Sequence, residues 1–360
     1  MSSSIGTAGG FADEPRELRD EDSFDTDALQ VWLHRHVPGM TVDEPHVRQF
    51  PGGASNLTYL LSYPDRELIL RRPPAGTKAA SAHDMVREFT FQDRLRPVFP
   101  QVPEVLALCR DESVIGGDFY VMERVPGVIL RGDLPAGLTL DAAHASRLGG
   151  SMVDTLVALH EVDVAAAGLA DLGRGSGYVT RQVSGWSDRF RRARTDNVPD
   201  FGAVMAWLDS NQPPDVGYGI VHGDFRMDNL VLDPSDFSVT ALLDWELATL
   251  GDPLMDLGSA MAYWVGAADD EGMQMARRQP SNLPGMPTRE EFVARYCDAR
   301  GLSSEDWTFY EVFGLFRLAV IAQQIYYRFH HGQTTNPAFE NFWMFVAYAE
   351  HRCRRIAGID

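Results

Sequence analysis

The sequence predicts an α+β fold built as two lobes, a small N-terminal sheet with one packed helix and a larger, mainly helical C-terminal part. Two observations predict this division. Short runs rich in β-branched and aromatic residues alternate with turn residues from residue 46 to 125, and apolar residues recur at helical spacing from residue 141 onward. A chain of 360 residues is also long enough for two cores of moderate size. We expect the lobes to cover residues 25–125 and 126–360.

The first lobe should contain five strands and two helices. Turn-rich segments such as YPDR separate the strand-like runs, and the stretch DMVREFTFQDRLR has the apolar spacing of a helix. The strands are expected at residues 46–50, 58–63, 67–72, 104–109 and 118–125, and the helices at 27–36 and 84–96. Residues 1–24 are rich in Ser, Gly, Asp and Glu and poor in large apolar side chains, which predicts a disordered acidic tail.

The second lobe should contain long amphipathic helices around one short β segment. The helices are expected at residues 141–162, 290–300, 304–329 and 336–356. The β segment reads GIVHGDFRMDNLVLD and then SVTALLDWE, so that two apolar strands flank a Pro-Ser-Asp turn. Residues 267–287 are polar and contain prolines, which predicts a long loop, and a substrate lid is one interpretation of it.

Composition excludes several classes of partner. The chain has 51 acidic residues against 32 Lys and Arg, a net charge of -19, which argues against nucleic acid and anionic membranes. No apolar run is long enough to span a bilayer, and the first residues lack the basic start and apolar stretch of a secretory signal. Cys109, Cys297 and Cys353 are irregularly spaced and suggest neither disulfides nor a zinc site. The expected location is the cytoplasm.

The residues with the clearest chemical pattern are His222-Gly223-Asp224, Asn229 and Asp244. Phosphoryl transfer requires one carboxylate that orients the attacking hydroxyl, and an amide and a second carboxylate that hold magnesium beside the phosphates. Asp224 suits the first role, and Asn229 and Asp244 suit the second. A five-residue step and then a hairpin can bring all three to one cleft. The pattern predicts a kinase that uses ATP and Mg²⁺ on a small-molecule hydroxyl, although each residue alone would more often be part of a turn, a cap or a strand end.

The segments HGDFRMDN and LLDWELATLGDPLMDLG resemble the catalytic and metal-binding segments of the aminoglycoside phosphotransferase family and its choline-kinase relatives. The resemblance covers roughly residues 45–260 and implies a protein-kinase-like, two-lobed fold. It also implies that Asp244 stands where protein kinases have the Asp of DFG. RRPP and DWELATLGDP are most similar to the kinase-like domains associated with acyl-CoA dehydrogenases, which favours a hydroxyacyl or other hydroxylated metabolite as the substrate.

The same resemblance implies a nucleotide site in the first lobe. GGASN lies between two strands, where small residues allow the backbone to approach a triphosphate, and Gly53, Ser55 and Asn56 are expected near the phosphates. The strand FYVMERVPG matches the hinge between the lobes, whose backbone from Glu123 to Val125 would bind adenine. The alternative is an ordinary hairpin turn and an ordinary buried strand.

The third strand departs from the family pattern at ILRR. Kinases usually have a Lys here that binds the α- and β-phosphates, but strand alternation places Arg71 on the cleft face, together with Ile69. Arg can clamp phosphate oxygens with two donors, so Arg71 can take this role, with Glu88 on the next helix as its partner. Arg72 is expected on a solvated face. The missing Lys also leaves open a second hypothesis, a nucleotide-binding regulatory pseudokinase with weak or no activity.

Further charged residues follow the DW segment. Asp252 before Pro253 is typical of a helix N-cap, and we expect Asp252 and Asp256 to brace the catalytic loop. For the acceptor, the sequence points in two directions. Asp269-Asp270-Glu271 could bind an amine-rich antibiotic, whereas Arg277-Arg278 in the same segment suits an anionic molecule.

Overall fold

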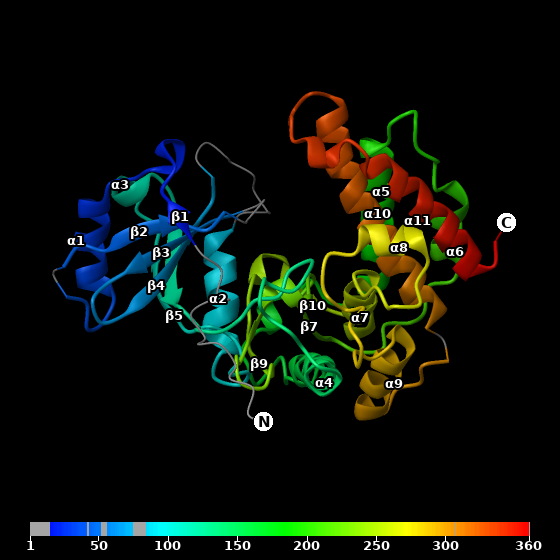
Figure 1. Ribbon diagram of the computed structural model, residues 1–360, viewed down its shortest axis with the longest axis horizontal. Helices are drawn as coiled ribbons and strands as arrows, with labels where there is room; N and C mark the ends of the chain where they lie inside the picture. Colours follow the sequence, from blue (N-terminus) through cyan, green and yellow to red (C-terminus); the bar gives the residue numbers. More distant parts are fainter. Residues whose placement is uncertain (1–14, 42, 52–55, 75–83, 306, 360) are drawn as a thin grey trace.

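Figure 1 shows the computed structural model, in which a small lobe and a larger lobe meet side by side. The structure describes residues 15–41, 43–51, 56–74, 84–305 and 307–359. The predicted α+β fold is confirmed, because the small lobe is an antiparallel sheet with helices and the large lobe is mainly helical. Among the described residues, no helix has both the length and the apolar run needed to cross a bilayer.

The small lobe contains a six-stranded antiparallel sheet in the order β1-β2-β3-β4-β6-β5. Its strands are β1 (Arg16–Glu17), β2 (His46–Gln49), β3 (Leu57–Ser62), β4 (Glu67–Arg72), β5 (Val105–Cys109) and β6 (Phe119–Glu123), and its helices are α1 (Thr26–His36), α2 (Met85–Leu95) and the single turn α3 (Glu112–Ile115). The five predicted strands and the two predicted helices are present, with small shifts of their ends.

Alternation along the strands gives this sheet two apolar faces. Leu68 and Leu70 of β4 belong to a buried cluster with residues of α1. Ile69, between them, belongs to a second cluster that includes Met85 of α2. Arg71 follows Ile69 on this second face, and both residues line the cleft between the lobes, as alternation predicts.

The N-terminal segment corrects one prediction. The disordered tail was expected to extend to residue 24, but Arg16–Glu17 pairs with β2, and Asp20–Asp22 forms a 3-10 turn. Phe24 then packs edge-on against the ring of Tyr59 at 5.2 Å between centroids. The contacts with the sheet supply burial that the segment's own composition lacks. Residues 1–14 lie outside the described residues.

Arg72 corrects a second prediction, because it is buried and not solvated. Only 7% of this residue is exposed. Its guanidinium donates to the carbonyl oxygen of Asp22 at 2.6 Å, to the carbonyl oxygen of Ile115 at 3.1 Å and to the hydroxyl of Tyr59 at 3.1 Å. The N-terminal segment covers this face of β4, and a buried guanidinium is tolerated there because its N–H groups have acceptors.

The large lobe is built around α10, which packs against α5, α7 and α11. Its helices are α4 (Ala142–His160), α5 (Tyr178–Ala193), α6 (Gly202–Ser210), α7 (Pro253–Ala262), α8 (Glu271–Ala276), α9 (Arg289–Arg300), α10 (Thr308–His330) and α11 (Phe342–Ala357). The four predicted long helices correspond to α4, α9, α10 and α11. Helix α5 has no predicted counterpart, because it contains weak helix formers such as Ser184 and Gly185, and tertiary packing of Val183 and Phe190 stabilises it.

The large lobe also contains two short antiparallel sheets of two strands each. The predicted hairpin is present as β8 (Leu230–Leu232) paired with β9 (Val239–Leu242). The second pair joins β7 (Gly219–Val221) and β10 (Thr249–Gly251). Residues 267–287 contain α8 and do not form the open loop that was expected. Within this segment Gln279 is 2% exposed and accepts a hydrogen bond from the backbone N–H of Met227 at 3.0 Å.

The burial of Arg72 generates a stability prediction. Arg72→Leu should lower the free energy of unfolding by about 2–4 kcal/mol, because two carbonyl oxygens and a hydroxyl lose their donors inside the lobe. Urea unfolding measures this change. The control is Arg66→Leu, at the turn before β4, whose contacts to Pro38 and Glu123 are long, 3.3 and 3.9 Å. The control should cost less than about 1 kcal/mol, and equal losses in the two variants would contradict the assignment.

Candidate active site

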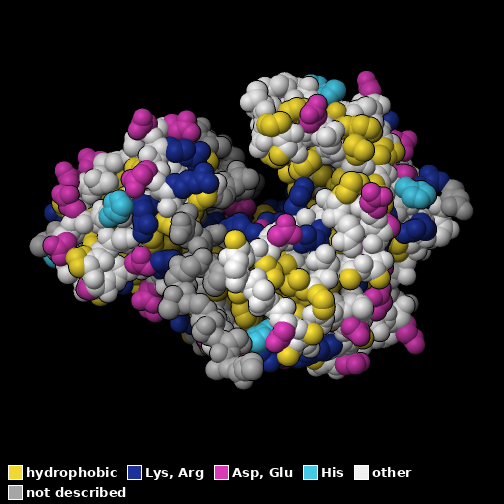
Figure 2. Space-filling model, in the orientation of Figure 1, with side chains coloured by type: hydrophobic (Ala, Val, Ile, Leu, Met, Phe, Trp, Pro, Cys, Tyr) yellow, Lys and Arg dark blue, Asp and Glu magenta, His cyan; other side chains and the backbone are white. Residues whose placement is uncertain are grey.

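A cleft with a volume of about 880 Å³ lies between the two lobes. Figure 2 shows this hollow, with Lys or Arg side chains along its floor. The residues predicted for nucleotide, metal and catalysis that line the cleft are Asn56, Arg71, Glu123, Val125, Asp224, Asn229 and Asp244. Glu88 lies directly behind Arg71, and Gly53 and Ser55 lie outside the described residues.

Asp224 and Asn229 reach the cleft from one tight loop between β7 and β8. Gly223 enters this loop with a φ of 85°, a left-handed conformation that favours glycine. The amide nitrogen of Asn229 donates to the backbone oxygen of Asp224 at 2.9 Å and to its carboxylate Oδ2 at 3.0 Å. These bonds hold the two side chains together and leave the amide oxygen of Asn229 as an acceptor.

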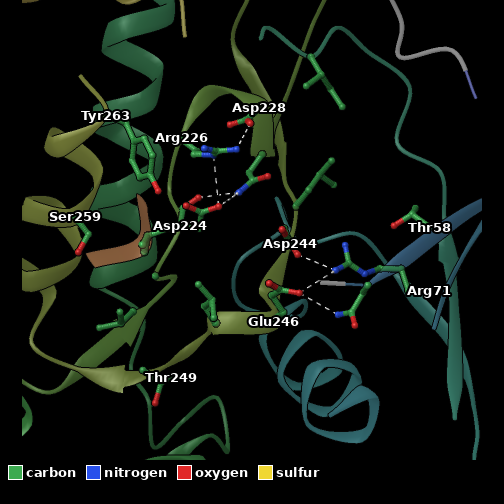
Figure 3. Close-up of a pocket in the computed structure, with 18 of the residues that line it drawn as sticks. Thr58, Arg71, Asp224, Arg226, Asp228, Asp244, Glu246, Thr249, Ser259 and Tyr263 are labelled. Atoms are coloured by element: carbon green, nitrogen blue, oxygen red, sulfur yellow. Dashed lines mark hydrogen bonds and ion pairs between the residues drawn. The ribbon is translucent and has the colours of Figure 1, made fainter. Parts of the chain in front are cut away.

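Asp244 reaches the same cleft from the end of β9. It is one of the few non-glycine residues with positive φ, at 65°, a conformation that costs about 1–2 kcal/mol. The next residue, Trp245, anchors it, because its indole is 1% exposed and donates to the carbonyl oxygen of Leu242 at 2.8 Å. Figure 3 shows Asp224 and Asp244 along the wall of one cavity. The hairpin of β8 and β9 therefore brings the carboxylate of Asp244 into the same cleft as the carboxylate of Asp224.

Arg71 connects the two lobes at this point. Its Nη2 donates to Oδ1 of Asp244 at 2.8 Å, and its Nε lies 3.2 Å from Oε1 of Glu88. Glu246 and Asn56 complete the cluster, since the amide nitrogen of Asn56 donates to Glu246 at 3.1 Å and to Glu88 at 3.4 Å. Burial raises the pKa of Glu88 although Arg71 opposes this shift. Figure 3 shows Arg71, Asp244 and Glu246 converging.

Arg226 is a site residue that the sequence analysis does not anticipate. Its Nε lies 3.5 Å from Oδ2 of Asp224, and its guanidinium pairs with Asp228. The guanidinium also lies over the ring of Tyr263, at 5.1 Å from the centroid. A cation two residues after Asp224 in the segment HGDFRMDN is the signal that could have identified it. Asp224 therefore lies between an amide and a guanidinium that fix its orientation.

The predicted bracing of the loop by Asp256 is present. Its carboxylate is 1% exposed and accepts hydrogen bonds from the backbone N–H of His222 at 2.7 Å and of Gly223 at 2.9 Å. The helix N-cap predicted at Asp252 is also present, because its side chain accepts from the N–H of Leu254 at 2.8 Å at the start of α7. Asp252 also accepts from the N–H of Val216 at 2.7 Å, which lies outside the loop that it was expected to brace.

A chain of buried donors supports Asp256. Nε2 of His160 lies 3.1 Å from the Asp256 carboxylate, and its Nδ1 lies 2.6 Å from the hydroxyl of Tyr296. Arg300 donates to that hydroxyl at 2.6 Å, so the Tyr296 proton is directed to Nδ1 and the His160 proton to Asp256. Burial lowers the pKa of His160. Burial alone would raise the pKa of Asp256, but the hydrogen bonds it accepts lower it below its ordinary value.

This arrangement predicts a pH-dependent stability. His160→Leu should lower the free energy of unfolding by about 2–4 kcal/mol at neutral pH, because the buried carboxylate loses a donor. Neutral His160 contributes fully to the free energy of unfolding at pH values above the pKa of an unfolded histidine, about 6.5. At lower pH this contribution decreases, because the unfolded state takes up a proton that the folded state does not. Urea unfolding should show that the difference in the free energy of unfolding between wild type and variant becomes smaller as the pH is lowered from about 7 to about 5.5.

The matched control is His144→Leu on the same helix, α4. His144 pairs with Asp141 at 2.8 Å, but Asp141 is largely exposed. An exposed pair contributes about 0–1 kcal/mol. A loss in the His160 variant no larger than in this control would contradict the role of His160 as the support of Asp256.

The charged groups considered for the acceptor lie away from the cleft. Asp269 pairs with Arg289 and with Arg352, the latter at 3.0 Å, and Asp270 accepts from Tyr348 at 2.6 Å. Arg277 pairs with Asp133. None of residues 269–278 lines the cleft. The large-lobe wall is instead formed by residues of α5, α7 and α10, to which the sequence analysis gave no part in acceptor binding.

Comparison with known proteins identifies related chains. The model of the phosphotransferase enzyme family matches residues 46–312. Acyl-CoA dehydrogenase family member 11 of Homo sapiens is 34% identical over 338 residues, which are 92% of this chain and 42% of that protein. Family member 10 of Mus musculus is 36% identical over 323 residues, 89% of this chain and 30% of that protein. The chain thus spans less than half the length of these relatives.

Solved structures agree with the fold. A candidate aminoglycoside phosphotransferase from Ralstonia eutropha is 31% identical and superposes with a TM-score of 0.78, covering 93% of this chain and 99% of that one. A macrolide 2'-phosphotransferase type I superposes with a TM-score of 0.59 at 19% identity over 92% of this chain and 98% of that one, which supports the fold alone.

Proposed function

The chain belongs to the phosphotransferase enzyme family, and we propose that it transfers the γ-phosphate of ATP to a hydroxyl group of a small molecule. One observation carries the proposal. Asp224, Asn229 and Asp244 line a single cleft between the lobes, and Arg71 of the small lobe contacts Asp244 there. This brings a carboxylate for the acceptor, two oxygen donors for a metal and a cation for phosphates to one place.

Asp224 would orient the acceptor hydroxyl. Its carboxylate is held by Asn229 and Arg226, so it presents a fixed oxygen to the cleft. A loose transition state requires little proton abstraction, and orientation is the main contribution of such a carboxylate. Arg226 is close enough to offset negative charge that develops between Asp224 and the phosphoryl group.

The metal donors suit Mg²⁺. Asp244 supplies carboxylate oxygens and Asn229 an amide oxygen, and hard cations prefer such ligands. The described residues contain no group of three His, Cys, Asp or Glu side chains that could hold a metal. This fits a kinase site, where Mg²⁺ is bound by one or two carboxylates together with phosphate oxygens. Bound there, Mg²⁺ would neutralise phosphate charge.

The nucleotide would lie against the small lobe. Met122, Glu123 and Val125 border the cleft at the connection between the lobes, and their backbone groups would bind adenine. Gly127, just after them, has a φ of 155°, and a Cβ there would lie 2.4 Å from a methyl group of Val231. Glycine therefore allows the connection to lie close to β8. Arg71 would bind the phosphates with Glu88 behind it, and Gly53, Ser55 and Asn56 would cover them.

For the acceptor, we propose a hydroxyacyl or similar hydroxylated metabolite. The similarity to acyl-CoA dehydrogenase family members 10 and 11 supports this class of acceptor. The acidic residues that would have favoured an amine-rich antibiotic are paired outside the cleft.

Cys109, Cys297 and Cys353 are buried and free, which supports a reducing location, the cytoplasm.

The central test is Asp224→Asn. With Mg-ATP and a panel of hydroxylated metabolites, the variant should lose about 10²–10⁴-fold in kcat, because the acceptor is no longer held by a carboxylate. Product formation is measured by mass spectrometry, and ATP binding by thermal stabilisation should persist. Asp209→Asn, on the exposed side of α6, is the control and should keep wild-type turnover. Unchanged turnover in the Asp224 variant would refute the assigned role.

A second test concerns Arg71. Arg71→Lys should keep more activity than Arg71→Ala, because one ammonium can still contact Glu88 or Asp244, whereas Ala leaves both carboxylates without a cation. We expect a loss of about tenfold for Lys and about 10²–10³-fold for Ala, since charge-assisted contacts of this kind are worth about 1.5–3 kcal/mol each. Initial rates at saturating and low ATP measure the effect. Equal activities in the two variants would remove Arg71 from the site.

A further inference from the structure

The large-lobe wall of the cleft is formed by matching faces of α5 and α10. On α5, the lining residues are Tyr178, Gln182, Trp186 and Arg189, and on α10 they are Phe313, Arg317, Ile321 and Gln324. In both helices the steps are four, four and three residues, so each set lies on one helical face. The two helices pack against each other, and the faces form one continuous surface that the kinase chemistry at Asp224 leaves unassigned.

Two guanidinium groups contact one indole ring on this surface. The Cζ of Arg189 lies 4.7 Å from the ring centroid of Trp186, and that of Arg317 lies 5.1 Å from it. Arg317 is 6% exposed, and its Nη2 donates to the carbonyl oxygen of Gly223 at 2.6 Å. The pair is thus next to the catalytic loop, because Gly223 directly precedes Asp224.

Neither guanidinium has a carboxylate within ion-pair distance among the residues that the structure describes. The acidic side chains of the cleft are Glu123, Asp224, Asp228, Asp244 and Glu246, and none belongs to α5 or α10. Partial burial, and then the positive charges of Arg192 and Arg317, lower the pKa of Arg189. The charge of this wall is therefore uncompensated by the described chain, although the protein as a whole carries a net charge of -19.

We propose that the α5/α10 wall is an acceptor subsite that binds an anionic oxygen group through Arg189 and Arg317, both of which line the cleft. This inference rests on the proposed kinase function and specifies the acceptor: a hydroxylated molecule with a carboxylate or phosphate at one end and an apolar body. The apolar body would lie on Trp186, Phe313 and Ile321.

Three properties of the wall select this chemistry. Guanidinium groups bind carboxylate and phosphate oxygens with two parallel donors. The indole holds both guanidinium groups by cation-π contact, which limits their rotation before a ligand arrives. An amine-rich acceptor would find two cations and no carboxylate among the cleft-lining residues of these helices. The same wall would therefore repel the cationic groups of such a molecule.

The experiment compares acceptors that differ only in charge. The panel consists of straight-chain hydroxy acids, their methyl esters, the matching amino alcohols and the coenzyme A thioesters of the acids. We expect the wild type to prefer an anionic member in kcat/KM. Arg189→Ala should lower the ratio of kcat/KM for the acid to that for its ester by about tenfold to a hundredfold, mainly through KM. Arg189→Glu should shift the preference toward the amino alcohol.

Arg192→Ala is the matched control. Arg192 lies on α5, one turn from Arg189, and does not line the cleft. Its Nε donates to the carbonyl oxygen of Asp188 at 3.1 Å. It should leave the acid-to-ester ratio unchanged. If the thioester reacts and the free acid does not, and the KM of the thioester depends on Arg189, the bound anion is a phosphate of the carrier. If the free acid reacts with the same dependence, it is the carboxylate.

Two outcomes separate this inference from the proposed function. Turnover with equal rates for acid and ester, unaffected by Arg189, would overturn the subsite and leave the kinase intact. Thermal stabilisation by the hydroxy acids with a non-hydrolysable ATP analogue, present in wild type and lost in Arg189→Glu, would support the subsite even if no acceptor is phosphorylated. Absence of turnover would then count against the kinase alone, and absence of any anion-dependent stabilisation or turnover would overturn the subsite.

Discussion

The buried carboxylate of Asp256 holds the loop on which the proposed chemistry depends. Both of its oxygens accept backbone N–H groups, from His222 and Gly223, immediately before Asp224. A backbone bonded in this way cannot rotate without leaving a buried charge unsatisfied, which is costly in a low-dielectric interior. His160 keeps that charge satisfied from the other side. The backbone that carries Asp224 is thus held from behind the cleft, and Asn229 and Arg226 orient its carboxylate within the cleft.

Arg71 connects the small lobe to the cleft residues of the large lobe. Through Glu88 it is tied to α2, and through Asp244 it is tied to the hairpin that starts at Asn229. The two lobes therefore meet through a charged cluster and not only through apolar packing. Such a cluster is satisfied by its own members before any nucleotide arrives, so a triphosphate with its cations would have to exchange contacts with it and not simply add to them.

Charges of opposite sign lie on different elements of the large lobe around the cleft. Carboxylates gather where β8, β9 and the catalytic loop end, whereas Arg189 and Arg317, which have no carboxylate partner among the described residues, lie on α5 and α10. In a confined, partly desolvated space this separation creates a directional field that can orient a ligand with one anionic end. The strongly acidic composition does not reveal this separation of charges, because net charge is a sum over the whole chain.

Local patterns predicted the parts of the protein that depend on neighbours in sequence. Alternation placed Ile69 and Arg71 on one face of β4, and the spacing from Asp224 to Asn229 with the following hairpin placed three polar side chains in one cleft. Asp252 before Pro253 marked the start of α7. Each of these outcomes follows from backbone geometry over a few residues, which a sequence states directly.

Tertiary structure alone decided the contacts between distant segments. Arg72 is buried because the N-terminal segment covers its face of the sheet, and the support of Asp256 by His160 joins residues 96 positions apart. The pairing of the α5 and α10 faces, which brings Arg189 and Arg317 to one indole, is of the same kind. Side-chain type and spacing determine which groups a segment can offer. Only the packing of helices and sheet determines which groups meet, because burial depends on what covers a residue and not on its neighbours in the chain.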